Sequence, residues 1–397
     1  MAKKLVVSGI GCSLVDILYN NVSFDSENFK PYISKKNGDG GLIPGNLVFK
    51  SDFEKFSNED FNDVLKKIVG DRAYDKINIG GPGIVSMIHA SQITDTNIAE
   101  FNFYGARGND KYGDFIIFLL KETPLLFDNY KSLDLPTALT TVLSDPNYNK
   151  GNGERIFVNS VGAAEEYDIS DINEDFFKSD IVIFGATALV PKTHDKLTSI
   201  LKKAKENKCI TIVNTVYDFR NEKANPNKKW PLGESEDSYK YIDLLITDKE
   251  EALRLSGTEN ITDAIIFFKE KGVGAAIITS GINDIQVFAN SRLFGEIVNL
   301  QMPISEAVIK DLQDGKGANG DTTGCGDNFA GGVISSVVSQ LHKSDLPIDL
   351  KEAVSWGIVS GGTATFYIGG MYREKEKGEK LALIKPYYEL YKNQIDE

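Results

Sequence analysis

The sequence contains few residues of the types that build disulfide frameworks and metal clusters. Its 397 residues include three cysteines, three histidines and two tryptophans. Cys12, Cys209 and Cys325 are far apart, odd in number and without the spacing of metal ligands, which fits a reducing compartment. Because no histidine lies near Cys325 in the sequence, a Cys/His nucleophile is disfavoured.

Long apolar runs and regions of dense positive charge are also missing. No apolar stretch approaches the ~20 residues of a membrane span. Gly9, Gly11 and Asp16 interrupt the N-terminal apolar run, which favours a first β-strand over a signal peptide. The formal net charge is −13, and no dense Lys/Arg run offsets it. We therefore expect a cytoplasmic protein that binds neither nucleic acid nor a membrane, and that holds any anionic ligand by local geometry.

Four short apolar runs give the clearest structural pattern. Each is bounded by polar residues or glycine, as strands buried on both faces are, and they cover 180–186, 209–215, 241–247 and 274–281. Helical patterns separate them, with one apolar face over 197–204 and a short helix over 261–271. This alternation is typical of βαβ units. It predicts an α/β fold with a doubly wound, mostly parallel sheet flanked by helices, and ligands at the carboxyl ends of the strands.

The first part of the chain is less regular. Residues 19–77 are rich in Asn, Asp, Lys and Phe, with a turn-forming stretch at 35–46. We expect strands and loops outside the main layer here, and most of 50–77 is interpreted as a surface insertion. Near the C-terminus, the charge run REKEKGEK (373–380) predicts a solvated loop or helix face.

The stretch GANGDTTGCGDNFAGG (317–332) combines many glycines with two aspartates, Asp321 and Asp327. Apolar residues after Asp327 recur at helical spacing, which places Gly324 to Asp327 at the N-terminus of a helix. The first turn of a helix has unpaired N–H groups and partial positive charge, and glycine lets a ligand approach them closely. The stretch therefore predicts an anion site.

Asp327 would then be a carboxylate beside an anion site. Such a group can take the proton of a hydroxyl that attacks a phosphoryl group, while the backbone N–H groups of Gly324, Cys325 and Gly326 stabilise the developing charge. The alternative is that Asp327 caps the helix and the glycines form a tight turn. The second aspartate and the two threonines that follow it favour the functional interpretation.

The motif DTTGCGD (321–327) resembles the DTxGxGD signature of the ribokinase-like (PfkB) family of carbohydrate and nucleoside kinases. Further segments resemble the family in the family's own order: VVSGIGCSLVDI (6–17), NIGGPGIVSMIHA (78–90), YGARGNDKYG (104–113), LLITDKEEA (244–252) and IITSG (277–281). The resemblance covers nearly the whole chain. It implies one ribokinase-like domain over residues 1–397, with a small β lid from parts of roughly 15–55 and 98–165.

The resemblance also implies roles for individual residues. Asp327 would be the catalytic base beside an anion hole formed by Gly324, Cys325 and Gly326. The acceptor would contact Asp16, Gly40, Gly41, Gly80 and Gly81. ATP would contact Asp248, Thr279, Gly281, Thr322 and Thr323, and Glu251 would order water around Mg²⁺. The implied cofactors are ATP, Mg²⁺ and a monovalent cation such as K⁺. The partner would be a small sugar or nucleoside, and homo-oligomerisation is left open.

Three positions depart from the family pattern. Val85 and Asp248 stand where the family often has Asn, and Asp284 replaces a second glycine of the nucleotide segment. None of these changes removes Asp327, so we expect an ATP-dependent kinase for a hydroxyl of a sugar or sugar derivative. A nucleoside kinase and a non-catalytic sugar-binding relative are the alternatives. A dinucleotide-binding oxidoreductase is a weaker one, because the glycine pair at 9–11 is followed by Leu14 where the fingerprint needs a small residue.

Overall fold

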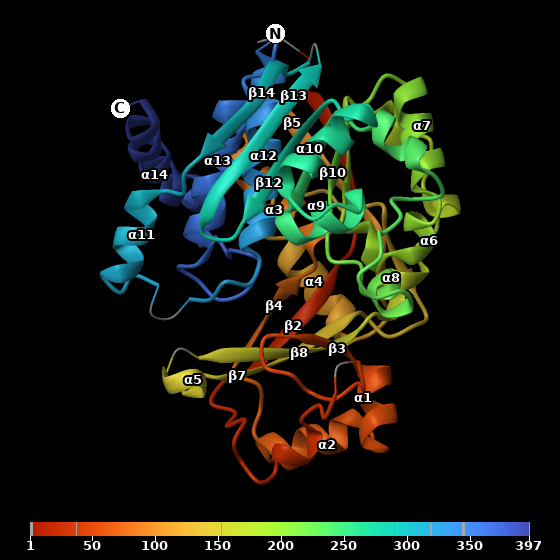
Figure 1. Ribbon diagram of the computed structural model, residues 1–397, viewed down its shortest axis with the longest axis vertical. Coiled ribbons are helices and arrows are strands. Elements are labelled where there is room, and N and C mark those ends of the chain that lie inside the picture. The colour runs from red at the N-terminus through yellow and green to blue at the C-terminus, as the bar shows by residue number, and fades with distance from the viewer. Residues whose placement is uncertain are drawn as a thin grey trace.

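Two β-sheets of different size organise the structure (Figure 1). The computed structural model describes residues 3–36, 38–151, 153–291, 293–317, 320–343 and 346–396. The large sheet has the strand order β14-β13-β12-β11-β10-β9-β1-β5-β6. Its strands are β1 (Leu5–Gly11), β5 (Ala99–Gly108), β6 (Tyr130–Leu133), β9 (Ile181–Gly185), β10 (Ile210–Asn214), β11 (Leu244–Asp248), β12 (Ala275–Ser280), β13 (Asn283–Ser291) and β14 (Gly295–Met302).

The central strands of the large sheet are parallel. β1 pairs in parallel with β5 and β9, and parallel pairing continues from β9 through β10 and β11 to β12. Only β13 and β14, at one edge, pair in the antiparallel sense among these strands. Every residue of β9 is buried, because helices cover both faces of the sheet. The four strands expected between 180 and 281 are confirmed as β9 to β12, and so is the mostly parallel sheet.

Helices enclose an apolar core on each face of the large sheet. One core packs α3, α12, α13 and α14 against it, and the other packs α7, α9 and α10. The helices are α1 (Lys50–Ser57), α2 (Phe61–Val69), α3 (Pro82–Ile93), α4 (Lys111–Leu120), α5 (Tyr148–Gly151), α6 (Pro191–His194), α7 (Leu197–Glu206), α8 (Phe219–Ala224), α9 (Lys249–Ser256), α10 (Ile261–Glu270), α11 (Glu306–Gln313), α12 (Cys325–His342), α13 (Leu350–Ala364) and α14 (Glu379–Asp396). The expected helices at 197–204, at 261–271 and after Asp327 are confirmed as α7, α10 and α12.

The small sheet lies at the end of the molecule opposite to both chain termini (Figure 1). Its strand order is β3 (Leu47–Phe49), β8 (Glu154–Ser160), β7 (Leu139–Asp145), β2 (Leu14–Tyr19) and β4 (Lys76–Gly80). One face is covered by α1, α2 and a third apolar core that contains Phe24, Phe29 and Phe53. The opposite face contacts the large-sheet part of the molecule through side chains described below.

Four of the five strands of the small sheet lie in the segments expected to contribute parts of a lid, roughly 15–55 and 98–165, and β4 lies outside them. The rest of 98–165 includes β5 and β6, which belong to the large sheet, because β5 pairs with β1 over residues 99–104. The interpretation of 50–77 as a surface insertion is wrong, since α1 and α2 bury Phe53 and Phe61 in the third core.

Two further findings concern the dinucleotide-binding fingerprint and membrane-spanning helices. β1 is followed by β2 rather than by a helix, so the strand-to-helix turn of a dinucleotide-binding fingerprint is not formed at residues 9–14. Within the described ranges, no helix is both long enough and apolar enough to cross a membrane.

Candidate active site

The glycine-rich loop leads directly into the first turn of α12. Gly324 is the N-cap and has a left-handed conformation with φ of 77°, which glycine adopts without steric cost. No side chain of the described residues caps this helix, and the N–H of Cys325 donates to the carbonyl oxygen of Thr322 at 3.4 Å. A Cβ placed on Gly326 would meet no atom within 4 Å, so the space beside the first turn is open. The arrangement has the features of an anion site, as the sequence predicts.

Asp327 is the third residue of α12 and not its cap, so the capping alternative is wrong. Its half-buried carboxylate makes no hydrogen bond to any described residue. Burial raises the pKa of Asp327 to about 7. A carboxyl group with this pKa is partly ionised at neutral pH and can accept a proton. By contrast, burial raises the pKa of the Cys325 thiol to about 12, so Cys325 can contribute its backbone N–H but not a thiolate.

Asp16 lies on β2, and its side chain occupies the space that Gly80 leaves free. A Cβ on Gly80 would lie 2.0 Å from Oδ2 of Asp16, so only glycine fits at that position. Burial raises the pKa of Asp16 to about 7, with Asp321 and Asp327 adding to the rise, whereas Thr140 and Arg155 oppose it. The mutual influence of these carboxylates indicates that Asp16 of the small sheet lies near the DTTGCGD loop.

A row of polar side chains extends from Asp16 across the small sheet. Asp16 is paired with Thr140 on β7, and Thr140 is paired with Asn159 on β8, so the three side chains share one face. Nδ2 of Asn159 donates to Oγ1 of Thr140 at 2.9 Å. Sequence analysis missed Thr140 and Asn159, because their roles depend on strand register rather than on a local motif.

Arg155 connects the small sheet to the glycine-rich loop, and sequence analysis missed it as well. It lies on β8 four residues before Asn159, so it points from the same face of the sheet. Its guanidinium donates to Oγ1 of Thr323 at 2.7 Å and to Oγ1 of Thr322 at 2.6 Å. It also lies 3.2 Å from Oδ2 of Asp321. The two threonines expected to contact ATP are thus held by a cation from the other part of the molecule.

Two more contacts join the small-sheet unit to the large one near α8. Lys223 of α8 forms an ion pair with Asp52 of α1, with a distance of 2.6 Å between Nζ and Oδ2. Phe49 at the end of β3 packs edge-on against Phe219 of α8, with ring centroids 5.7 Å apart. Phe219 also packs against Tyr217. An aromatic group therefore lies where the two units meet, next to Asn159, with which Phe49 is paired.

A second cluster of expected residues lies at the carboxyl ends of β11 and β12. Asp248 caps α9 by accepting from the N–H of Glu251 at 2.8 Å. Glu251 is buried and accepts from the hydroxyl of Thr215, and burial together with Asp248 raises the pKa of Glu251. This pair forms a capping box, so part of its role is structural.

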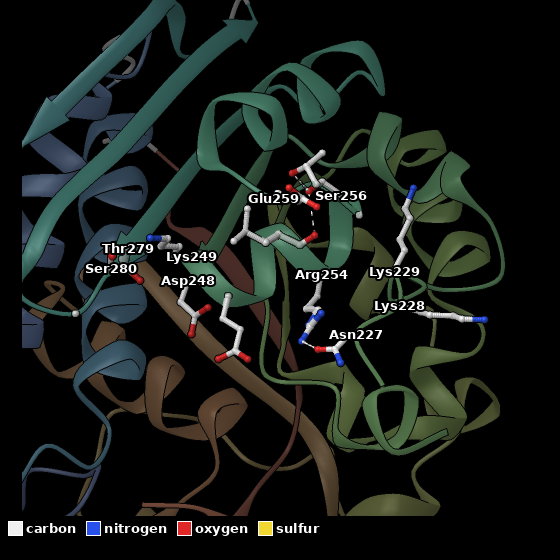
Figure 2. A pocket seen from close by; sticks show the side chains of 15 residues that line it. Asn227, Lys228, Lys229, Asp248, Lys249, Arg254, Ser256, Glu259, Thr279 and Ser280 are labelled. Atoms are coloured by element: carbon white, nitrogen blue, oxygen red, sulfur yellow. Dashed lines mark hydrogen bonds between the residues drawn. The ribbon is translucent and has the colours of Figure 1, made fainter. Parts of the chain in front are cut away.

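Asp248 and Thr279 are directly paired between the two parallel strands, and Gly281 follows β12 with open space around it. All three line a cavity of about 930 Å³. Figure 2 shows Asp248 and Thr279 at one end of the cavity and Asn227 at the other, where it accepts a hydrogen bond from Arg254. The expected nucleotide residues of these two strands therefore share one cavity wall.

Not every expected residue joins these clusters. A Cβ on Gly40 would meet the backbone of Asp52, and one on Gly41 would meet Ser34, so both glycines serve the packing of their own segment. The assignment of Gly40 and Gly41 to the acceptor site stays a prediction. Gly81 is the N-cap of α3 and lies close to the backbone of Ser13.

Comparison with known proteins places this geometry in context. Residues 66–374 match the model of the pfkB family carbohydrate kinases. No curated protein matches the sequence. Among solved structures, a probable sugar kinase from Rhizobium etli is similar, with 16% identity, a TM-score of 0.68, and coverage of 98% of this chain and 100% of the other. An adenosine kinase from Sinorhizobium meliloti is similar at 20% identity and a TM-score of 0.67, covering 97% and 99% of the two chains.

A ribokinase from Thermotoga maritima has the same fold, with 18% identity, a TM-score of 0.59 and coverage of 98% and 99% of the two chains. At these identities the structural neighbours show the shared fold, and the family match carries the assignment. That match spans the segment from α2 to the loop before α14, including the whole glycine-rich loop, and it establishes that the chain belongs to the pfkB family of carbohydrate kinases.

Proposed function

We propose that this protein transfers the γ-phosphoryl group of ATP to a hydroxyl of a sugar or sugar derivative. The observation that carries the proposal is Asp327, a carboxylate with a near-neutral pKa in the first turn of a helix whose N-terminus is capped by glycine and by no side chain. A helix N-terminus favours an anion, and a carboxylate beside it has no structural use as a cap here. Family membership supports the same reaction.

In the proposed reaction, the oxygen of the acceptor hydroxyl bonds to the γ-phosphorus, and Asp327 accepts the proton of that hydroxyl. The bond from that phosphorus to the bridging oxygen breaks, which leaves ADP and the phosphorylated acceptor. The N–H groups at Gly324, Cys325 and Gly326 stabilise charge on the phosphoryl oxygens. Asp16, supported by Thr140, orients the acceptor hydroxyls.

Nucleotide binding is assigned to both clusters. Thr322 and Thr323 would lie along the phosphates, while Thr279 and Gly281 would lie nearer the adenosine end. Asp248 would contact the nucleotide, and Glu251 would order water around the Mg²⁺ that arrives with ATP, since Mg²⁺ usually keeps several waters in proteins. When bound with ATP, Mg²⁺ neutralises phosphate charge. We assign no residue to K⁺.

The small sheet is proposed to act as a lid over the acceptor. Asp16 and Arg155 both point from it toward the glycine-rich loop, so closure of the sheet would complete the site and exclude water. The proposal includes a small-molecule partner and a cytoplasmic location, and it needs neither nucleic acid nor a membrane.

One observation favours a nucleoside as the alternative acceptor. Phe49, Phe219 and Tyr217 form an aromatic group at the Asn159 end of the polar row. A ribose at Asp16 could place an attached base against these rings, because aromatic faces bind planar groups well.

The test is a screen of sugars, sugar acids and nucleosides by coupled ADP release, with the Asp327→Asn enzyme as a matched control. The proposal requires acceptor-dependent ADP release that the control lacks. If ADP release is equal in the two enzymes with every acceptor, the proposed function is wrong. A response to nucleosides but not to free sugars would select the alternative.

A further inference from the structure

A buried lysine lies directly behind the glycine-rich loop. Lys380 is the second residue of α14 and is 1% exposed, although the charge run at 373–380 predicts solvated side chains. Its ammonium donates to Oδ1 of Asn328 at 2.9 Å, and this is its one hydrogen-bond partner among the described residues. Burial of an amino group without a carboxylate partner is costly, so the position calls for a functional reason.

Asn328 connects Lys380 to the backbone of the loop. Its Oδ1 also accepts from the hydroxyl of Tyr367 at 3.0 Å and lies 2.6 Å from Nδ1 of His89. Its Nδ2 donates to the carbonyl oxygens of Gly324 and Gly370, each at 2.8 Å. An ammonium group can only donate and a carbonyl oxygen can only accept, so protonated Lys380 and the two carbonyls together fix the orientation of the amide, with its oxygen toward Lys380 and its nitrogen toward the carbonyls.

The two carbonyls belong to the segments that shape the anion site. Gly324 is the N-cap of α12, and the direction of its peptide sets the direction of the N–H groups that follow. Gly370 follows Gly369, whose N–H donates to Asp321 at 3.3 Å. The amide of Asn328 therefore joins both segments from the side opposite to the open space at Gly326.

We propose that Lys380 is a positioning residue for phosphoryl transfer, which acts through Asn328 to hold the Gly324 peptide in the orientation that the anion hole needs. This inference rests on the proposed function. It also gives the buried charge a role, because an ammonium behind an anion site stabilises the bound phosphates.

The charge of Lys380 is linked to ligand binding. Burial lowers the pKa of Lys380 to about 7, and Glu374 opposes this shift. The other titratable groups around it are His89 from α3, Tyr367 from the preceding loop, and Asp327 next to Asn328 on α12. A bound phosphate favours the ammonium form, so the lysine would take up as much as about half a proton at pH 7 when ATP binds.

The kinetic test compares Lys380→Met, Lys380→Gln and the control Lys377→Met, which replaces an exposed lysine of the same charge run. Methionine removes the donor, whereas glutamine keeps an N–H for Asn328. We expect Lys380→Met to lower kcat by roughly 10–100-fold with little change in the acceptor KM. Lys380→Gln should have a kcat several-fold above that of Lys380→Met, and Lys377→Met should match the wild type. A folded Lys380→Met enzyme with wild-type kcat would overturn the proposal.

A binding experiment covers the case in which Lys380→Met does not fold, and it needs no turnover. Calorimetry with a non-hydrolysable ATP analogue, in buffers of different ionisation enthalpy, counts the protons taken up at pH 7. It is done in the Asp327→Asn enzyme, with and without Lys380→Gln, so that Asp327 does not contribute. Greater uptake with Lys380 present supports the proposal, and equal uptake contradicts it. If the wild type releases no ADP with any acceptor, the proposed function fails while this measurement still tests Lys380.

Discussion

Replacement of Asp327 by asparagine separates chemistry from structure at the centre of the site. The two side chains have nearly the same shape, and Asp327 caps no helix and accepts no hydrogen bond from a described residue. The substitution therefore removes a proton acceptor without removing a structural contact. We expect the fold and the affinity for ATP to be retained, because the N–H groups of the helix N-terminus are backbone groups.

The expected loss of activity follows from the role of a general base. Such groups are typically worth ~10²–10⁴ in rate, so kcat should fall by that factor. The thermal midpoint at pH 8 should stay the same or rise. The pKa of Asp327 is raised, so its ionised form is disfavoured in the folded protein above pH 7, and asparagine removes that cost. Steady-state kinetics and thermal denaturation of both enzymes at pH 8 test these expectations.

The pH profile gives an independent measurement. The base must be ionised, so kcat/KM of the wild type should rise with pH, reach half its plateau near pH 7, and be about tenfold lower at pH 6. Asp16 titrates in the same range, and its pKa should fall in Asp327→Asn because Asp327 contributes to its rise, so the loss of kcat together with the change in profile assigns the base. An Asp327→Asn enzyme that keeps most of its kcat and the wild-type profile would refute the assignment.

Three other substitutions test the remaining parts of the site. Arg155→Met should lower kcat/KM by at least roughly tenfold in steady-state assays, because Asp321 loses its cation, whereas an unchanged value would remove Arg155 from the site. Gly80→Ala should raise the acceptor KM with little effect on the KM for ATP, because the new Cβ of the alanine would overlap Oδ2 of Asp16. Equal effects on the KM values of both substrates would argue against Asp16 as the acceptor contact. Glu251→Gln should increase the Mg²⁺ concentration needed for half-maximal rate in a titration at fixed ATP. An unchanged Mg²⁺ dependence would show that Glu251 serves only the capping box.

The sequence predicts those features that depend on neighbouring residues. The buried strands β9 to β12 are continuous apolar runs, and the first turn of α12 follows a local glycine pattern, so both can be recognised without the rest of the chain. Arg155 cannot be recognised in this way. It is a single arginine within an ordinary strand, and its partners Thr322 and Thr323 lie 167 and 168 residues further along the chain.

The same reasoning applies to the small sheet and the charge run. Which parts of 98–165 join the small sheet depends on strand pairing, since β5 joins the large sheet through its pairing with β1, which no local pattern reveals. Lys380 ends a run of mostly exposed charged residues, so the composition of the run predicts solvation. Asn328, 52 residues away, offers the acceptor that the buried ammonium needs. Partners far along the chain thus determine the environments of Arg155 and Lys380.

Because the net charge of the chain is negative, the cations Arg155 and Lys380 matter for the binding of an anionic nucleotide. Asp16, Asp321 and Asp327 lie close enough for the latter two to raise the pKa of Asp16, so the site is negative before any phosphate arrives. With a formal charge of −13, the molecule as a whole does not attract an anionic nucleotide. The attraction must therefore come from the N–H groups of α12, from Arg155 on one side of the loop and from Lys380 on the other. Arg155 belongs to the small sheet and Lys380 to the large-sheet part of the molecule, so an open lid would leave only Lys380 behind the anion site. If the small sheet acts as the proposed lid, its closure would bring this second cation to the loop, where Arg155 contacts Thr322 and Thr323.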